Sequence, residues 1–380
     1  MNILVVRFEN FPYGSAPAFR TLQILKLLAA TQNDITLISR HYNADDIFIN
    51  EWNNKKTTIE CISIEKFQSS YSRAIKFCLN NKKYDLVLRP TSIRHFTEIQ
   101  KIIEQNHIPQ VFDSVEWYDP SNWRLQRLDF RYYKFQFLWK YRFHKADGII
   151  AISRLIYKYF TVKNNNVVRI PTITDCKNTP YRIKIKNSKI KFIFAGQLDK
   201  GKDNLDTFIS AMVAADPEGT LTQLDIYGPN VIDVQKHLGK QAYILEKHSN
   251  ILIHGKVSQK EAQEACLNSD FSVFFRLNRR SANAGFPTKL GECMTFGTPA
   301  ICNDTGDISL VLKNRVNGYL LKGKSHDEIY EVLIHILGLT ISEREKMRCE
   351  ARKSAEEFFH YENYQDEIKK VLYSAIERKI

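Results

Sequence analysis

One segment of the chain combines the residue types that a phosphate-binding site needs. Residues 271–308 read FSVFFRLNRRSANAGFPTKLGECMTFGTPAICNDTGDI. The opening apolar run predicts a strand, and Pro287 fits the first turn of a helix, where its missing N–H costs no hydrogen bond. Gly285 allows a ligand to approach the backbone closely. The N–H groups at a helix start, together with the helix dipole, favour binding of a diphosphate.

The elements that position this segment follow from a regular alternation. Strand-like apolar runs alternate with helical stretches along the whole chain, which predicts an α/β protein with mainly parallel sheets. The alternation restarts at residue 189, after a Pro-, Lys- and Asn-containing linker. We therefore predict two Rossmann-like domains, over residues 1–175 and 176–355, and a helix over 356–380 that is free to cross back to the first domain. Two such sheets joined by a short linker are expected to face each other across a cleft, where their ligands bind.

Eight short motifs, taken in order, carry a family resemblance. They resemble those of glycosyltransferase family four, the retaining enzymes with the GT-B fold. The resemblance covers nearly the whole chain, and its motifs are PYGSA at 12–16 with Arg20, ADGIIAIS at 146–153, FAGQLDKG at 194–201, DIYG at 225–228, IHGKV at 253–257, AGFP at 284–287 followed by Glu292, FGTPAI at 296–301 and NGYL at 317–320. Each motif is weak alone, and together they are specific.

The resemblance implies a role for each matching residue of the second domain. Glu292 would accept hydrogen bonds from the ribose hydroxyls, and Lys200 would neutralise the departing phosphate. The backbone N–H groups of Phe286, Thr288 and Lys289 would hold the diphosphate and the sugar, to which Pro287 contributes none. Gly228 would allow the base to lie against the backbone, with Lys256 and Val257 nearby. Fixed donors around the developing charge would lower the reaction barrier.

The chain also departs from the family pattern. Ala284 stands where the family has its first glutamate, and Gln197 replaces the arginine of the phosphate turn. Arg276, Arg280 and Lys289 are candidates to compensate. A subset of the family carries this Ala-Gly-Phe-Pro-Thr-Lys loop, which favours an active variant. The alternative is an inactive module of the same fold that binds a nucleotide-sugar or serves as a scaffold.

In the first domain, the predicted acceptor site involves the first glycine-rich turn and one strand end. Gly14, Ser15 and Arg20 belong to the turn. Asp113 and Glu116 follow or end a predicted strand and could orient the acceptor hydroxyl, with Trp117 beside them. The family is thought to use the leaving phosphate as its base, so no protein base is required. The structural alternative is that Glu116 caps a turn and Trp117 only packs.

The charge balance suggests an anionic partner. Lys and Arg number 55 against 42 Asp and Glu, a net charge of +13. Basic and aromatic residues alternate over Trp123–Lys145, a composition typical of helices that lie on an anionic bilayer. A helix with one buried aromatic face and one solvated basic face would give the same composition. The charged stretch Glu343–Arg352 is predicted to be a solvated helix.

Several classes of protein are disfavoured. No HExxH motif, paired His/Cys cluster or strand-end Asp-x-Asp occurs, so we expect no metal and no other cofactor. No helix-turn-helix or RNA-recognition signature supports a nucleic-acid partner. The seven cysteines form no CxxC pair, and the start of the chain predicts a strand without a signal peptide, as in a cytoplasmic protein.

The predicted function is metal-independent, retaining hexosyl transfer from a UDP- or GDP-sugar. The acceptor would be a glycan or a lipid-linked intermediate of bacterial surface polysaccharide synthesis, such as capsule or O-antigen. The enzyme would be cytoplasmic and peripheral on the inner face of the cell membrane.

Overall fold

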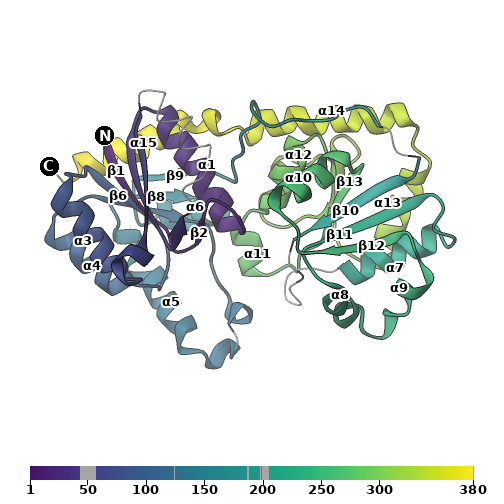
Figure 1. Ribbon diagram of the computed structural model, residues 1–380, viewed down its shortest axis with the longest axis horizontal. Coiled ribbons are helices and arrows are strands. Elements are labelled where there is room, and N and C mark those ends of the chain that lie inside the picture. Colours follow the sequence, from purple (N-terminus) through teal and green to yellow (C-terminus); the bar gives the residue numbers. More distant parts are fainter. Residues whose placement is uncertain (43–56, 124, 186–187, 197, 199–204, 380) are drawn as a thin grey trace. The chain divides into compact units, whose positions relative to one another are not determined.

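The computed structural model describes residues 1–42, 57–123, 125–185, 188–196, 198 and 205–379. The chain folds into two compact units (Figure 1). The first contains Met1–Ile173, Ala284–Phe286 and Tyr361–Ile380, and the second contains Thr174–Asn283 and Pro287–His360. The division therefore falls at residues 173 and 360, close to the predicted 175 and 355, and it assigns three residues of the AGFP motif to the first unit.

The first unit is built on a seven-stranded parallel sheet in the order β5-β3-β1-β6-β7-β8-β9. Its strands are β1 (Asn2–Val6), β3 (Asp34–Ser39), β5 (Ile59–Ser63), β6 (Leu86–Pro90), β7 (Gln110–Ser114), β8 (Gly148–Ala151) and β9 (Val167–Arg169), and the short β2 (Asn10–Phe11) and β4 (His41–Tyr42) pair separately. Its helices are α1 (Ala16–Ala30), α3 (Tyr71–Asn81), α4 (Phe96–Gln105), α5 (Phe130–Tyr141), α6 (Arg154–Thr161) and α15 (Gln365–Glu377).

Alternate side chains of these strands face two different cores. Ile3 and Val5 of β1 pack with α1 and with α15, the helix from the end of the chain. Leu4 and Val6 of the same strand pack with α3 and α4 on the other face. Both faces are covered, which is why the strands read as continuous apolar runs in the sequence.

The second unit repeats this architecture with a six-stranded parallel sheet in the order β12-β11-β10-β13-β14-β15. Its strands are β10 (Ile190–Ala195), β11 (Thr222–Tyr227), β12 (Ile251–Gly255), β13 (Phe271–Phe274), β14 (Ala300–Asn303) and β15 (Gly318–Leu321). Its helices are α7 (Leu205–Ala215), α8 (Val231–Leu238), α9 (Ile244–Lys247), α10 (Gln259–Asn268), α11 (Arg280–Ala284), α12 (Thr288–Thr295), α13 (His326–Leu337) and α14 (Ile341–Phe358).

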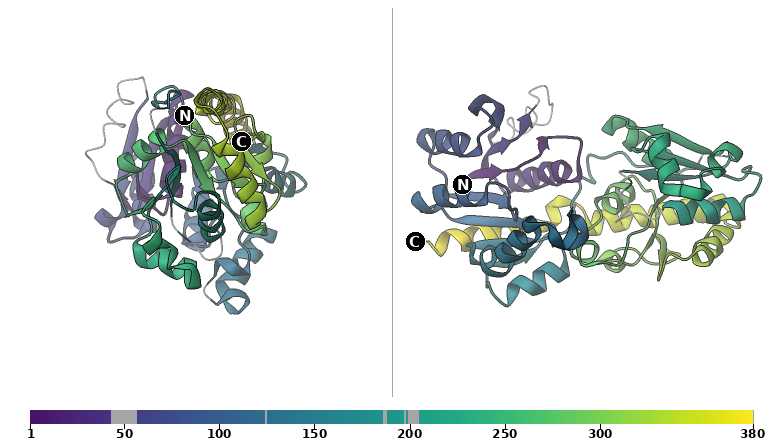
Figure 2. Two further views of the ribbon diagram at one scale, coloured as in Figure 1. Left: turned by 90° about the vertical axis from the view of Figure 1, so that its right-hand side faces the viewer. Right: turned by 90° about the horizontal axis from the view of Figure 1, so that it is seen from below.

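Two helices of this unit cover the face that matters for the site. Ile193 and Ala195 of β10 pack with Cys266 of α10, with Cys293 of α12 and with Phe296, the residue that follows α12. The opposite face packs against α7, α8 and α13. In both further views of Figure 2, the strands of each unit lie among helices. Helices α10 and α12 therefore approach each other over the central strand β10.

Helix α14 corrects one prediction. Its arginines at positions 344, 348 and 352 are buried, whereas the sequence predicted a solvated helix. Arg348 donates to the carbonyls of Leu267 (3.0 Å), in the last turn of α10, and of Ser269, its C-cap residue. Arg352 donates to the carbonyl of Thr295 at the end of α12. A charged guanidinium is well suited to the unpaired carbonyls at a helix C-terminus. These arginines therefore hold the ends of the two helices that flank the site.

Candidate functional site

Three glycines connect the ends of β10, β11 and β12. The Gly196 N–H donates to the Tyr227 carbonyl (2.9 Å), and the Gly228 N–H donates to the Gly255 carbonyl (2.7 Å). Gly228 has φ +111°, and a Cβ atom there would lie 2.2 Å from the Gly196 carbonyl oxygen. Only glycine fits such a position without movement of the backbone. The sequence predicted that Gly228 allows a nucleotide base to lie against the backbone. In the structure, the atom that a side chain at Gly228 would meet is the carbonyl oxygen of Gly196, at the end of the neighbouring strand β10.

Helix α12 begins beside these strand ends. Pro287 is its N-cap residue, with φ −70° and ψ 113°, and no side chain caps the helix start. The sequence placed this proline one position later, in the first turn. Thr288 and Lys289 are the first helical residues, so their N–H groups lie in the turn where helices bind anions.

Two charged side chains of α12 lie one turn apart and line the same cavity. Lys289 extends across Gly196, and its Nζ lies 4.2 Å from the centre of the Phe194 ring. Burial raises the pKa of Glu292 to about 7, and the charge of Lys289 partly offsets that rise. A carboxyl in this environment gains from hydroxyl donors, because they stabilise its charged form.

The cavity that these two side chains line has a volume of about 90 Å³. Residues of α10 and α12 form its walls, and residues of β10 and β13 form its floor. The thiols of Cys266 on α10 and Cys293 on α12 are 2.8 Å apart in the wall. The exposed lining is mostly apolar, and its polar members are Lys289, Glu292, Gln259, Gln263 and Ser272. The cavity therefore suits a flat, partly apolar group that carries hydroxyls.

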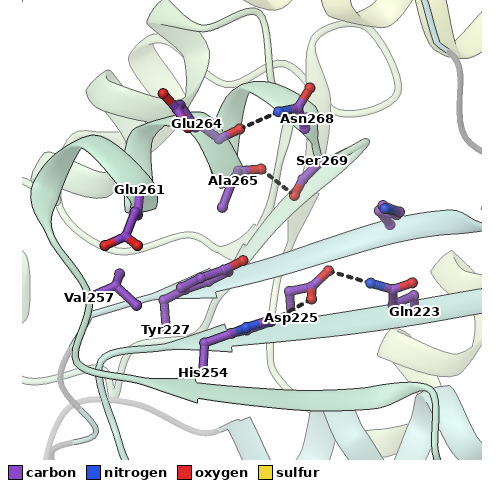
Figure 3. A pocket seen from close by; sticks show the side chains of 11 residues that line it. Gln223, Asp225, Tyr227, His254, Val257, Glu261, Glu264, Ala265, Asn268 and Ser269 are labelled. Carbon is purple, nitrogen blue, oxygen red and sulfur yellow. Dashed lines mark hydrogen bonds and ion pairs between the residues drawn. The ribbon is translucent and has the colours of Figure 1, made fainter.

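A larger groove of about 410 Å³ lies beside it, between α10 and the strands β11 and β12 (Figure 3). His254 Nε2 lies 2.7 Å from Asp225 Oδ1, and the rings of His254 and Tyr227 stack at 4.2 Å. Val257, a predicted neighbour of the base, and Glu261 line the same groove (Figure 3). Lys256, the other predicted neighbour, is exposed and is not among the lining residues.

The sequence analysis included Asp225, Tyr227 and His254 in two of its motifs but gave their side chains no role, and it did not single out Gln223 or Glu261. A signal for them was present, since Gln223, Asp225 and Tyr227 alternate along β11 and must share one face of the strand. Polar residues at every second position of a central strand indicate a face that is not fully covered.

The arginine-rich loop is tied to its own backbone. The Arg276 N–H donates to Asn303 Oδ1 (2.8 Å), and its guanidinium donates to the Ala282 carbonyl (3.0 Å) at the next helix. Arg280, in α11, is half-buried. Arg276 therefore holds the loop that leads to the AGFP motif, and its predicted contact with phosphate stays a prediction.

The AGFP motif is buried. Ala284, Gly285 and Phe286 are all buried, and the Ala284 carbonyl accepts a hydrogen bond from Ser153 Oγ (2.6 Å). The Ser153 hydroxyl also accepts from the Ile156 N–H (3.3 Å), as the N-cap of α6. Ser153 ends the ADGIIAIS motif, so the structure joins two of the motifs on which the resemblance depends.

Two predicted residues, Lys200 and Gln197, lie outside the described part of the chain. The role of Lys200 at the departing phosphate and the part of Gln197 in donor binding stay predictions.

The predicted acceptor residues Asp113 and Arg20 need correction. Asp113 is fully buried, and its carboxylate accepts hydrogen bonds from Arg7 Nη2 (2.9 Å) and Arg20 Nη2 (2.7 Å). Arg20 also donates to the Pro171 carbonyl (2.8 Å). Although burial opposes it, the charges of Arg20 and Arg7 lower the pKa of Asp113. This group fastens α1 to the sheet and offers no surface to a substrate.

Trp117 also has a structural role. Its ring stacks on Trp139 (4.9 Å between centres) and contacts Tyr159 (4.6 Å), which agrees with the packing alternative. Glu116 is half-buried and close to Tyr118, whose pKa is raised by burial and by the charge of Glu116.

The first glycine-rich turn has a simple local structure. Gly14 is exposed with φ +99°, and Ser15 caps α1 by accepting a hydrogen bond from the Ala18 N–H (3.2 Å).

Within the described ranges, no group of three or more His, Cys, Asp or Glu side chains could hold a metal ion. Across those same ranges, no helix has the length and apolar character that a membrane span requires.

Residues 177–354 match the family model of the "Glycosyl transferases group 1". This match covers most of the second unit, including α12 and the residues that line both cavities. Among curated proteins, no sequence match to the chain is found.

Solved structures resemble the chain over nearly its full length. HepE from Anabaena, in complex with UDP and glucose, is 14% identical, with 98% of this chain and 100% of that chain covered and a TM-score of 0.70. Sucrose-phosphate synthase from Thermosynechococcus elongatus is 14% identical over 97% of both chains, with a TM-score of 0.71. WaaG, a glycosyltransferase involved in lipopolysaccharide biosynthesis, is 16% identical over 99% of this chain and 98% of that one, with a TM-score of 0.62. The GT-B fold with two Rossmann-like domains, predicted from the sequence, is confirmed.

Proposed function

We propose that the protein is a glycosyltransferase that moves a hexosyl unit from a UDP- or GDP-sugar to a glycan or lipid-linked acceptor. The observation that carries this proposal is the pair Lys289 and Glu292 on α12, which line one cavity beside the ends of β10 and β13. The match of residues 177–354 to group 1 glycosyl transferases supports it. Complexes of the similar HepE with UDP and with UDP-glucose make UDP the first donor nucleotide to test.

In this proposal each part of the site has one task. The ribose hydroxyls donate to the Glu292 carboxylate, and the N–H groups of Thr288 and Lys289 hold the diphosphate. The Lys289 ammonium lies one turn from Glu292 and opposes the negative charge that the leaving nucleotide gains. Retention of configuration, independence of metals and the identity of the sugar belong to the proposal.

We place the acceptor in bacterial surface polysaccharide synthesis and the enzyme at the inner face of the cell membrane. Two similar structures support the choice of acceptor, the lipopolysaccharide outer core galactosyltransferase WaaB and WaaG, a glycosyltransferase involved in lipopolysaccharide biosynthesis. No nucleic-acid partner is proposed.

One observation favours a second candidate, a binding module of the same fold without turnover. Ala284 has no exposed surface, and its carbonyl is bonded to Ser153. The position therefore offers no carboxylate to the hydroxyls of a donor sugar. Such a module would bind a nucleotide without releasing it from the sugar.

The experiment that separates the two candidates is a panel of UDP-, GDP-, ADP- and dTDP-sugars. Each is scored for thermal stabilisation of the protein and for release of the nucleotide, with and without membrane extract as a source of acceptors. The variants are Glu292→Ala and Lys289→Met, and Glu331→Ala on the exposed side of α13 is the matched control.

The transferase proposal expects stabilisation by one nucleotide series and release that both site variants lose and the control keeps. Stabilisation without release under every condition would support the binding module. If no nucleotide stabilises the protein, both candidates are wrong.

A further inference from the structure

Helix α5 is apolar on two sides. Its residues Phe135, Leu138 and Trp139 are buried in the first unit. A second set, at positions 130, 133, 137 and 141, is aromatic and exposed by 72%, 58%, 57% and 47%. At about 100° per residue, this second set lies within an arc of about 80°. One side of the helix therefore belongs to the core, and the other presents a row of aromatic rings to solvent.

The loop before the helix extends this row. Leu125 is 60% exposed, and Leu128 is 86% exposed, more than any other large apolar side chain in the described residues. We call Leu125, Leu128, Phe130, Tyr133, Phe137 and Tyr141 the α5 surface. Single exposed apolar residues are normal in proteins, but six within one short segment mark an interaction surface. Figure 1 shows α5 at the lower edge of the first unit.

The charges around the α5 surface have a single sign. Six basic residues between positions 125 and 145 are exposed, namely Arg127, Arg131, Lys134, Lys140, Arg142 and Lys145. The one acid in this range, Asp129, is buried, caps α5 and binds Arg131 (2.5 Å). Anionic groups would therefore meet no exposed carboxylate of this segment.

We infer that the α5 surface is a docking site for an anionic lipid bilayer. Leucine and phenylalanine side chains would enter the boundary between headgroups and acyl chains, and tyrosine hydroxyls would stay among the headgroups. Lysine and arginine side chains reach outward to lipid phosphates while their stems cover apolar surface. The twelve-residue helix would lie in the plane of the membrane and would not cross it.

This docking deepens the proposed function and, as a route to a lipid-linked acceptor, rests on it. Binding to lipid can nevertheless be measured without any nucleotide. The test is co-sedimentation of the full-length protein with vesicles of phosphatidylcholine alone and with equal parts of phosphatidylcholine and phosphatidylglycerol, at low and at high salt.

Two variants address the two contributions. The first combines Leu128→Ser, Phe130→Ser and Phe137→Ser, and the second combines Lys134→Gln and Lys140→Gln. The matched control combines Val162→Ser and Tyr243→Ser, which remove apolar side chains that are 78% and 55% exposed elsewhere. Circular dichroism and thermal unfolding check that every variant folds.

We expect wild-type and control proteins to bind the anionic vesicles at low salt and to bind neutral vesicles at least tenfold more weakly. The apolar variant should lose at least tenfold in affinity. The charge variant should lose about tenfold at low salt and much less at high salt, where the attraction is screened.

Equal binding of all four proteins, or no binding to anionic vesicles, would overturn the inference. Loss of self-association or of a protein complex in the apolar variant, without vesicle binding by the wild type, would show that the surface contacts protein. Nucleotide stabilisation is scored in parallel, so a failure of the donor site is seen separately from a failure of docking.

Discussion

Glu292 gives the most direct test of the site, because its environment predicts a dependence of stability on pH. The carboxyl has an ordinary pKa of 4.5, and burial raises it to about 7 in the folded protein. Between these two pH values the folded protein holds a proton that the unfolded chain has released, so stability falls as the pH rises. The fall is complete near pH 7. At about 1.4 kcal/mol per pH unit, it amounts to about 3 kcal/mol.

Replacement of Glu292 by glutamine removes this titration with little change of shape. At pH 4.5 the variant and the wild type should be equally stable, and at pH 8 the variant should be more stable by about 2–3 kcal/mol. Differential scanning calorimetry is the suitable assay, because all four tryptophans precede residue 140 and their fluorescence reports the first unit. Glu331→Gln, at an exposed position, is the control.

The same carboxyl should make nucleotide binding dependent on pH. Ribose hydroxyls donate hydrogen bonds to the charged form of the Glu292 carboxyl, so UDP would bind the protein in which Glu292 is deprotonated. Below pH 7, binding of UDP would therefore release the proton of Glu292. The affinity for UDP should fall about tenfold from pH 8 to pH 6 in the wild type and stay level in Glu292→Gln, as measured by calorimetric titration. A difference in stability that is constant from pH 4.5 to pH 8, together with a level affinity in the wild type, would refute the reasoning.

Three further predictions concern the frame of the site. Gly228 has φ +111°, and Gly228→Ala places a Cβ 2.2 Å from a carbonyl oxygen. This variant should lower the free energy of unfolding, measured by calorimetry, by more than about 2 kcal/mol. The control Gly338→Ala, at φ −82°, should leave it unchanged. Asp113→Asn leaves two arginines buried without their carboxylate and should cost about 3–5 kcal/mol by urea unfolding. Because the pKa of Asp113 is lowered, this cost should shrink as the pH falls below about 4. Arg352→Met leaves the carbonyl at the end of α12 unpaired and should cost about 2–4 kcal/mol in calorimetry, while Lys353→Met should change stability by less than about 0.5 kcal/mol.

The sequence alone determined the elements and the place of the candidate site. Apolar runs alternating with helical stretches predicted two parallel sheets, because strands covered on both faces are apolar throughout. Gly285, Pro287 and Glu292 predicted a helix start with an acidic residue in the following turn, and the structure has α12 there. These features depend on neighbours within a few residues, so local patterns could reveal them.

Tertiary structure decided which of the polar and aromatic residues are exposed. Asp113 was predicted to meet a substrate, but its partner Arg7 lies 106 residues away in the sequence and no local pattern joins them. Arg348 was predicted to be solvated, but in the structure α14 packs against the end of α10 and Arg348 donates to the Leu267 carbonyl there. Composition likewise could not show which side of α5 is buried, since both sides are aromatic. Burial depends on contacts between distant segments, and a charge or a ring acquires its role only when those contacts are made.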